Sequence, residues 1–215
     1  SGLLGNFAAG VPPVEPFAPK IEHDPAAGAS QPAVSGGTLF TTRDAKLLVV
    51  SDPDHDRVHV IDAEAQRILF SHDLQAGDEP GRVVEDAGGR LHVVLRGAGA
   101  IASFSRSATA GVRRRQVCEL PRGIAYDEAR DVLHVACAEG ALVTLPAAES
   151  DEVIRRSQLQ PDLRDVLVRG SELYVSRFRS AELLHLSAEG ALLDRQRPPT
   201  LMADEVTFTS PGKAE

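Results

Sequence analysis

The chain has 215 residues, of which 42% are hydrophobic but only 4% aromatic, with no Trp. This length suffices for one domain with a substantial core, which must be built from Val, Leu, Ile and Ala. The formal net charge of −8 argues against a nucleic-acid-binding role, because phosphate binding needs clustered positive charge. No apolar run of about 18 residues is present, so we expect no transmembrane segment.

Residues 1–35 are rich in Ala, Gly and Pro, and the prolines stand too close together for a helix or a central strand. We therefore predict a semi-extended tether. The basic start and apolar stretch of a signal peptide are missing, which fits a cytosolic protein or a mature form whose signal was removed. A processed secreted protein or a lipoprotein with an N-terminal lipid anchor would suit this start, and so would a cut within a longer chain.

From residue 36 the chain repeats one short strand four times, as residues 46–50, 90–94, 132–136 and 172–176, with Leu47, Leu91, Leu133 and Leu173 leading. A second set of segments precedes these strands by a turn, at 38–41, 80–86, 121–127 and 163–169. A third set follows them, at 58–61, 101–104, 142–145 and 183–186. More variable fourth strands are expected near 68–70, 115–118, 153–155 and 191–193.

Four short strands per 40 to 45 residues is the period of a propeller blade, and the 3.6-residue stripes of a helical solenoid are absent. The sequence thus predicts an all-β fold, a β-propeller segment of four four-stranded blades plus the first strand of a fifth. We expect the four blades within 36–203, at about 36–79, 80–120, 121–162 and 163–203. Residues 204–215 would hold the further strand, Asp204–Phe208, and a tail.

A lone fifth-blade strand would leave an unpaired edge, which proteins usually cover. We therefore predict that this chain is part of a larger propeller, completed by a missing C-terminal part of the parent chain or by a protein partner. The alternative is a closed small propeller in which the last strand completes the first blade, because closure removes edges.

The segments Asp52–Asp62 and Pro121–Asp127 resemble the YVTN-type propeller repeats of bacterial surface and periplasmic proteins. Residues 117–145 and 165–186 are similar to the N-terminal propeller part of large bacterial proteins that carry c-type haem further along. The resemblance implies an extracytoplasmic module that docks or positions a haem-bearing part of the same parent or a partner. Covalent haem needs Cys-x-x-Cys-His, which this chain lacks, so we expect no cofactor in it.

The two cysteines are predicted to form a disulfide. Cys118 ends a fourth strand and Cys137 ends the second strand of the next blade, and antiparallel alternation brings both ends to one face. A disulfide would place the protein outside the reducing cytosol, in the periplasm or at the cell surface. Two buried thiols are the alternative. No second pair of ligands has the spacing of a zinc site.

Asp52, Asp54 and Asp56 alternate as calcium-loop carboxylates do, but the Gly and distal Glu of an EF-hand are absent. They lie in an expected turn, where Asp serves turn geometry alone, and this interpretation is favoured. His92 and His134 share one repeat position with Leu48 and Tyr174. A position that accepts such different residues is interpreted as structural, and no catalytic residue is predicted.

Six arginines form the candidate site for a ligand or a protein partner. One set precedes the innermost strands and the other follows the second strands, so both should emerge on one face near the axis: Arg82, Arg122, Arg164, Arg96, Arg177 and Arg179. Converging guanidinium groups suit a carboxylate, a phosphate or an acidic surface. The alternative is pairing with acids such as Glu79, Glu119, Asp162 and Asp165.

These features predict a non-catalytic binding or scaffolding module. The alternative is a lactonase-like or quinoprotein-like enzyme with its active site in the axial funnel. Fold alone does not decide between them.

Overall fold

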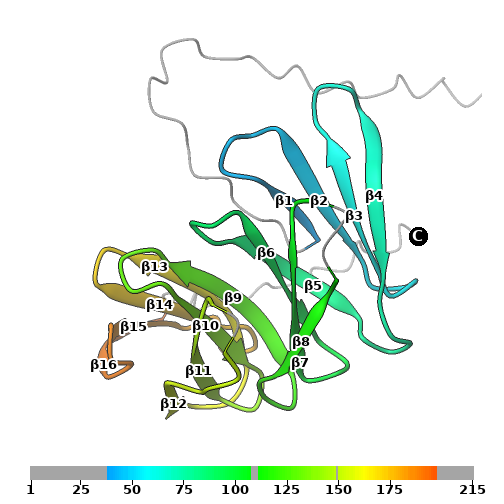
Figure 1. Cartoon of the computed structure of the whole chain (residues 1–215). Coiled ribbons are helices and arrows are strands. Elements are labelled where there is room, and N and C mark those ends of the chain that lie inside the picture. Colours follow the sequence, from blue (N-terminus) through cyan, green and yellow to red (C-terminus); the bar gives the residue numbers. More distant parts are fainter. Residues whose placement is uncertain (1–37, 108–110, 149, 198–215) are drawn as a thin grey trace, which may run out of the picture. The chain divides into compact units, whose positions relative to one another are not determined.

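The structure is a computed structural model that describes residues 38–107, 111–148 and 150–197. These residues form sixteen β-strands in four antiparallel sheets, and no helix occurs among them (Figure 1). The prediction of an all-β propeller segment with four four-stranded blades is confirmed. The predicted tether and the predicted strand Asp204–Phe208 lie outside the described residues.

Each sheet is an up-and-down meander in chain order, and we number the sheets as blades 1 to 4. Blade 1 contains β1 (Leu39–Thr41), β2 (Leu47–Asp52), β3 (Arg57–Asp62) and β4 (Arg67–Asp73). Blade 2 contains β5 (Pro80–Glu85), β6 (Arg90–Leu95), β7 (Ala100–Ser105) and β8 (Arg113–Gln116). Blade 3 contains β9 (Pro121–Asp127), β10 (Val132–Cys137), β11 (Ala141–Pro146) and β12 (Arg155–Gln158). Blade 4 contains β13 (Leu163–Arg169), β14 (Glu172–Arg177), β15 (Leu183–Ser187) and β16 (Leu192–Gln196).

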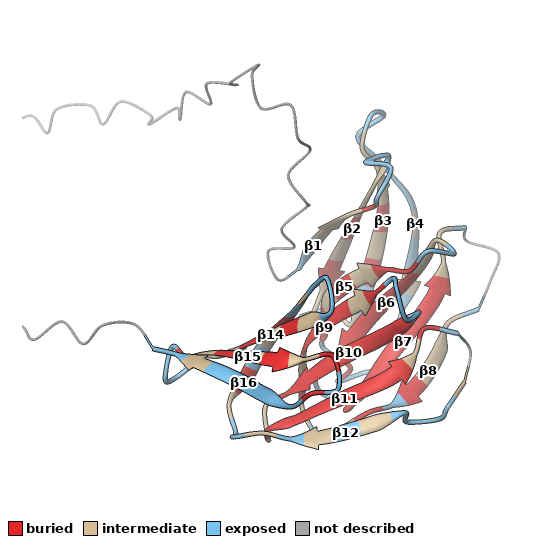
Figure 2. Cartoon of the chain, turned by 90° about the vertical axis from the view of Figure 1, so that its left-hand side faces the viewer, coloured by how far each residue is buried: buried red, intermediate tan, exposed pale blue. Residues whose placement is uncertain are grey.

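The middle strands of blades 2 and 3 are covered on both faces. All six residues of β10 are buried, and five of six are buried in each of β6, β7 and β11 (Figure 2). Neighbouring sheets bury both sides of such strands, which explains their nearly continuous apolar sequence. The outer strands β12 and β16 contain no buried residue, because the rim of each blade faces solvent.

An apolar cluster lies between each pair of successive blades. Val49, Val58 and Val60 of blade 1 pack with Leu91 and Val93 of blade 2. The next cluster joins Val94 and Ile101 to β9–β11, and a further one joins blade 3 to Leu173, Val175 and Leu184 of blade 4. The innermost strands β1, β5, β9 and β13 lie beside one another in this order. This arrangement brings the beginnings of β5, β9 and β13 together.

The structure corrects the repeat alignment of blade 1 by one residue. Val49 lies opposite Phe40, as His92 lies opposite Val84 and His134 opposite Ala125. Phe40, Val84 and Ala125 each stand two residues before the last residue of the innermost strand that bonds to the second strand. These last residues are Thr42, Asp86 and Asp127. Leu48 is therefore the counterpart of Leu91, and Val49 that of His92. The apolar doublet Leu47-Leu48 hid the register in the sequence, and a one-residue slip exchanges the two faces of a strand.

The outer strands also differ from their predicted positions. β8 ends at Gln116, two residues before Cys118, and β12 begins at Arg155. Val153 and Ile154, which were predicted to begin that strand, are 40% and 50% exposed. An outer strand pairs on one side only and has little buried surface, so its sequence carries a weak pattern.

Candidate functional site

A repeated irregularity marks the beginning of the innermost strands. The pairing register of β5, β9 and β13 shifts within their first four residues, where Pro80, Pro121 and Leu163 stand first. The residue that follows each of these is Gly81, Arg122 and Arg164, respectively. A β-bulge bends its strand and redirects a side chain, and bulges are frequent next to functional sites. Arg122 and Arg164 are therefore presented at this end of the blades by equivalent bulges.

Between blades 3 and 4, these two arginines line a cleft of about 370 Å³. We call it the arginine cleft, and its lining consists of Leu120, Arg122, Ala138, Pro161, Asp162, Leu163, Arg164, Phe178 and Arg179. The guanidinium carbon of Arg164 lies 5.1 Å from the centre of the Phe178 ring, in cation–π geometry. Phe178 is 67% exposed, so the cleft combines positive charge with an exposed aromatic ring.

Positive charge in the arginine cleft is poorly balanced. Burial, together with the charges of Arg164 and Arg96, lowers the pKa of the Arg122 guanidinium, and Glu79 opposes this. Among the described residues, the side chains of Arg122 and Arg164 have no hydrogen bond and no ion pair. Asp162 supplies a carboxylate to the lining, but it accepts a hydrogen bond from the backbone N–H of Arg179. A bound anion would therefore relieve the repulsion at Arg122.

Arg82 does not join this cleft. In blade 2 the bulge holds Gly81 and the next residue is Arg82, whereas in blade 3 the order is Arg122 and then Gly123. Arg82 Nη2 lies 2.6 Å from Asp165 Oδ2, which links blade 2 to blade 4. Gly123 makes room for this contact, because a Cβ there would lie 2.6 Å from the Cα of Asp165. Burial raises the pKa of the Asp165 carboxyl, and the charge of Arg82 opposes that rise.

Two arginines that follow second strands are also held by their own blades. Arg96 Nε donates to the carbonyl of Glu79 at 3.3 Å, and its Nη2 lies 3.8 Å from the Glu79 carboxylate. Arg177 donates to the carbonyl of Pro161 and pairs with Glu182. The structure thus brings Arg122, Arg164 and Arg179 together, places Arg96 near Arg122, and gives Arg82 and Arg177 carboxylate partners.

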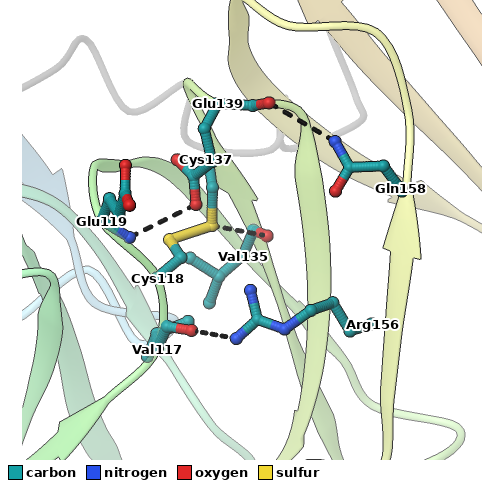
Figure 3. Close-up of a disulfide and its surroundings, with 8 residues drawn as sticks. All are labelled: Val117, Cys118, Glu119, Val135, Cys137, Glu139, Arg156 and Gln158. Carbon is teal, nitrogen blue, oxygen red and sulfur yellow. Dashed lines mark hydrogen bonds between the residues drawn. A yellow bond between two sulfur atoms is a disulfide. The ribbon is translucent and has the colours of Figure 1, made fainter.

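A disulfide between Cys118 and Cys137 adjoins the arginine cleft, with an S–S distance of 2.07 Å and a Cα–Cα distance of 6.4 Å (Figure 3). It ties the segment that enters blade 3 to the end of β10. Leu120, two residues after Cys118, and Ala138, which directly follows Cys137, belong to the cleft lining. The cross-link therefore fixes one wall of the cleft.

Among the described residues, one group of His, Cys, Asp and Glu side chains is close enough to hold a metal: Cys118, Cys137 and Glu139. Both sulfur atoms are bonded to each other, so neither is a thiolate ligand. The Glu139 carboxylate accepts a hydrogen bond from the Glu119 N–H at 3.3 Å (Figure 3). The disulfide gives this group a structural role.

Of the three aspartates predicted as weak calcium ligands, Asp52 ends β2, and Asp54 and Asp56 lie in the β2–β3 turn. Asp52 accepts hydrogen bonds from the backbone and ring of His55. Asp56 accepts hydrogen bonds from the N–H groups of Gly77 and Glu79, both at 2.7 Å, and so fixes the segment that leads into blade 2. Asp54 is exposed. The contacts of Asp52 and Asp56 are those of turn-stabilising carboxylates.

His92 and His134 are fully buried between blades. His92 Nδ1 lies 2.8 Å from Ser103 Oγ and Nε2 lies 3.2 Å from Asp86 Oδ2. His134 repeats this arrangement, with Nδ1 3.1 Å from Thr144 Oγ1 and Nε2 3.8 Å from Asp127 Oδ2. Burial lowers the pKa of His92, and it lowers the pKa of His134 to about 4. These histidines are covered by the next blade and support the sheets.

Sequence reasoning did not find the acidic and hydroxyl partners of these histidines. The signal that identifies them is their repeat position: Asp86 and Asp127 follow β5 and end β9, while Ser103 and Thr144 lie opposite the histidines on the third strands.

No helix in the described part of the chain is long and apolar enough to cross a membrane.

Comparisons with known proteins identify the fold and no family. No family model matches the chain, and no curated protein matches it. A solved structure of streptogramin B lyase has a TM-score of 0.66 at 16% identity over 80% of this chain. Hydrazine synthase of Kuenenia stuttgartiensis gives 0.65 at 14% over 82%, and the β-propeller domain of Cps50 (Swd1) from Myceliophteria thermophila gives 0.64 at 11% over 75%.

At these identities the similarity concerns the fold alone. The chain spans 58%, 53% and 57% of those three proteins, respectively, so it corresponds to little more than half of each. The comparisons identify neither a YVTN-type repeat family nor a link to c-type cytochromes, and both stay predictions.

Proposed function

We propose that this chain is a binding module of an extracytoplasmic bacterial protein, and that it docks an acidic protein segment in the arginine cleft. The observation that carries the proposal is Arg122, which is presented by a bulge and lacks a carboxylate partner among the described residues. Arg164 and Phe178 stand beside it. Arginine and aromatic side chains dominate the energetically important centres of protein interfaces.

The lining of the cleft favours a peptide over a bare ion. Leu120 and Ala138, which are both half-buried, and the exposed ring of Phe178 provide apolar surface beside the guanidinium groups. A peptide that carries a carboxylate and a neighbouring apolar side chain would use both surfaces, whereas an inorganic anion would use only the charge. The resemblance to haem-associated propellers makes a haem-bearing part of the same parent one candidate for such a partner.

The extracytoplasmic location rests on the disulfide. Disulfides persist in oxidising compartments and are rare in the cytosol. Intact-mass analysis of protein isolated without reductant tests this point, because oxidation of two thiols removes two hydrogens, about 2 Da. Free thiols in that protein would remove the support for this location.

Similar structures include lyases, a putative 6-phosphogluconolactonase and a mitotic checkpoint complex, so the fold itself does not distinguish an enzyme from a binding protein. The arginine cleft supports binding, because it offers fixed cations and an apolar surface. The buried histidines of blades 2 and 3, which have the chemistry of catalytic groups, are shielded by the following blades.

A fluorescence anisotropy titration with a labelled peptide of alternating Glu and Leu tests the proposal. Arg122→Ala combined with Arg164→Ala should weaken binding by about tenfold or more, the effect of losing charge-assisted hydrogen bonds. Arg67→Ala combined with Arg57→Ala in blade 1 removes the same charge from another exposed place and should leave binding nearly unchanged.

Equal losses in both double variants would show that the peptide reads only net charge, and the proposed site would be wrong. Competition with inorganic phosphate separates the ligand classes. Displacement of the peptide by phosphate at similar affinity would assign the cleft to small anions instead of an acidic peptide.

A further inference from the structure

A buried carboxylate oxygen without a partner lies beside the disulfide. Glu139 Oε2 is buried and, within the part of the chain that the structure describes, has no hydrogen bond. A carboxylate oxygen of Glu139 lies within 4.8 Å of the sulfur atoms of both Cys118 and Cys137 (Figure 3). A buried oxygen that has lost its hydration and gained no hydrogen bond is costly, so this position favours a cation.

Two thiolates and one carboxylate form a ligand set for zinc. The disulfide withholds both sulfur atoms, but its reduction yields two thiols, and thiols lose their protons when they bind a metal ion. Zinc in proteins takes Cys, Asp and Glu ligands, and a site with three protein ligands keeps its fourth position for water. Magnesium and calcium prefer oxygen ligands alone. The set therefore selects a soft or borderline divalent cation of the zinc class.

The third ligand of this set comes from the turn between β10 and β11. Glu139 stands two residues after Cys137, so the set does not contain the second pair of Cys or His that zinc motifs usually carry. The N–H of Gly140 donates to the carbonyl of Cys137 at 2.9 Å and closes the turn. The Glu119 N–H donates to the Glu139 carboxylate at 3.3 Å and orients it, as outer partners of metal ligands do.

Backbone hydrogen bonds hold the two cysteine segments together independently of the disulfide. The N–H of Cys118 donates to the carbonyl of Gly99 at 3.1 Å, and the N–H of Ala138 donates to the carbonyl of Leu120 at 2.9 Å. The cysteines should therefore stay adjacent after reduction. Rotation about their Cα–Cβ bonds then suffices to place the two Sγ atoms about 3.7 Å apart, as a tetrahedral zinc site requires.

The three groups are also accessible to an entering ion. Cys137 is completely buried, whereas Cys118 and Glu139 are half-buried. An ion can thus reach the carboxylate and the first sulfur atom from solvent, and the buried second sulfur atom completes the site.

We propose that the reduced chain binds one divalent cation of the zinc class through Cys118 Sγ, Cys137 Sγ and a Glu139 carboxylate oxygen. A dithiol reductant transfers two electrons and two protons to the disulfide and itself becomes a cyclic disulfide. The cation then replaces the two thiol protons, which are released to solvent. The disulfide and the metal site are alternative states of the same two cysteines. This inference does not rest on the proposed function, because it concerns metal binding and not the capture of an acidic peptide.

Titration of the reduced chain with Co²⁺ tests the site, because Co²⁺ bound to thiolates shows a charge-transfer absorption band. The chain, without a histidine tag, is reduced with dithiothreitol and desalted under nitrogen, and circular dichroism checks its sheet content. Glu139→Gln removes one ligand and keeps the size of the side chain. Glu119→Gln is the matched control, since it removes the same charge from an exposed neighbour and retains the backbone N–H that donates to Glu139.

We expect one Co²⁺ per reduced chain, loss of the band on addition of Zn²⁺, and no band in the oxidised chain. Glu139→Gln should weaken binding by at least about tenfold, the lower end of the loss seen when partners of metal ligands are removed. Glu119→Gln should leave the affinity nearly unchanged.

A reduced chain that shows no thiolate band would overturn the proposal, and so would equal affinities in Glu139→Gln and Glu119→Gln. Binding of one Co²⁺ per two chains would assign the cysteines to a site shared between copies and would refute the proposed ligand set. A chain that loses its sheet signal on reduction and does not recover it with Zn²⁺ would refute the site as well, because the folded backbone must hold the ligands together.

Discussion

Blades 2 and 3 differ from blades 1 and 4 although all four repeat the same strand. Leu91 and Leu133 are completely buried, because a preceding blade covers them, whereas their counterpart Leu48 in blade 1 is half-buried. On the other face, His134 is completely buried while its counterpart Tyr174 in blade 4 is half-buried. The contribution of a residue to the free energy of unfolding therefore depends on whether a neighbouring sheet covers it, even at the same repeat position. Four predictions test this difference between the inner and the terminal blades.

The largest difference is expected between two leucines at the same repeat position. Leu133→Ala should lower the free energy of unfolding by about 2–5 kcal/mol, the range for cavities in cores, and Leu48→Ala by about 1 kcal/mol. Chemical denaturation followed by circular dichroism measures both. Equal losses would mean that blade 1 is as well covered as blade 3 in solution, and the distinction between inner and terminal blades would fail.

The disulfide should strengthen the junction of the inner blades. It closes a loop between residues separated by 19 positions, and its removal by Cys118→Ser with Cys137→Ser should lower the free energy of unfolding by about 3 kcal/mol. The peptide affinity of the arginine cleft should also fall, because Leu120 and Ala138 are no longer fixed. Unchanged stability and unchanged affinity would show that packing alone holds blades 2 and 3 together.

Acid should destabilise blade 3 through His134. Its pKa is lowered from 6.5 to about 4 by burial, so the unfolded chain binds a proton that the folded chain excludes. The stabilising contribution is complete above pH 6.5 and is lost as the pH falls toward 4. The expected loss is about 3 kcal/mol over that window, following the linkage between protonation and folding.

His134→Gln should flatten the pH dependence of unfolding between pH 6.5 and 4. His55→Gln changes an imidazole with 74% side-chain exposure and should leave the dependence as it is. A wild-type slope that persists in His134→Gln would assign the acid sensitivity to other groups, with buried His92 next to be replaced.

The smallest effect is expected at Leu167, which is 65% exposed on the face of blade 4 that points away from blade 3. Leu167→Ser should change the free energy of unfolding by no more than about 0.5 kcal/mol if the face is open, as is usual for surface substitutions. A loss of 1 kcal/mol or more, on the order of a buried side chain, would show that a sheet covers Leu167.

Much of the candidate site was predictable because its elements recur with the blade period. Arg82, Arg122 and Arg164 were predicted to precede the innermost strands, and they lie in the first residues of these strands. The cysteines lie near strand ends that come together, as predicted. The sequence did not show that the arginines have different roles. Blade 2 has Gly81 followed by Arg82, whereas blade 3 has Arg122 followed by Gly123, so a different side chain occupies the bulge in each blade. Arg82 consequently pairs with Asp165 across the axis, whereas Arg122 and Arg164 reach the cleft.

By itself, the sequence determined the number of strands per repeat, the order of the four sheets and the proximity of Cys118 to Cys137. These properties follow from alternation and spacing, which are local. Tertiary structure decided the face on which Leu48 and Val49 lie, the buried partners of His92 and His134, and the convergence of Arg122, Arg164 and Phe178. Each of these features depends on contacts with a neighbouring sheet. The sequence of one repeat specifies the hydrogen bonds within its own sheet, but it does not specify which side chains of another sheet will cover it.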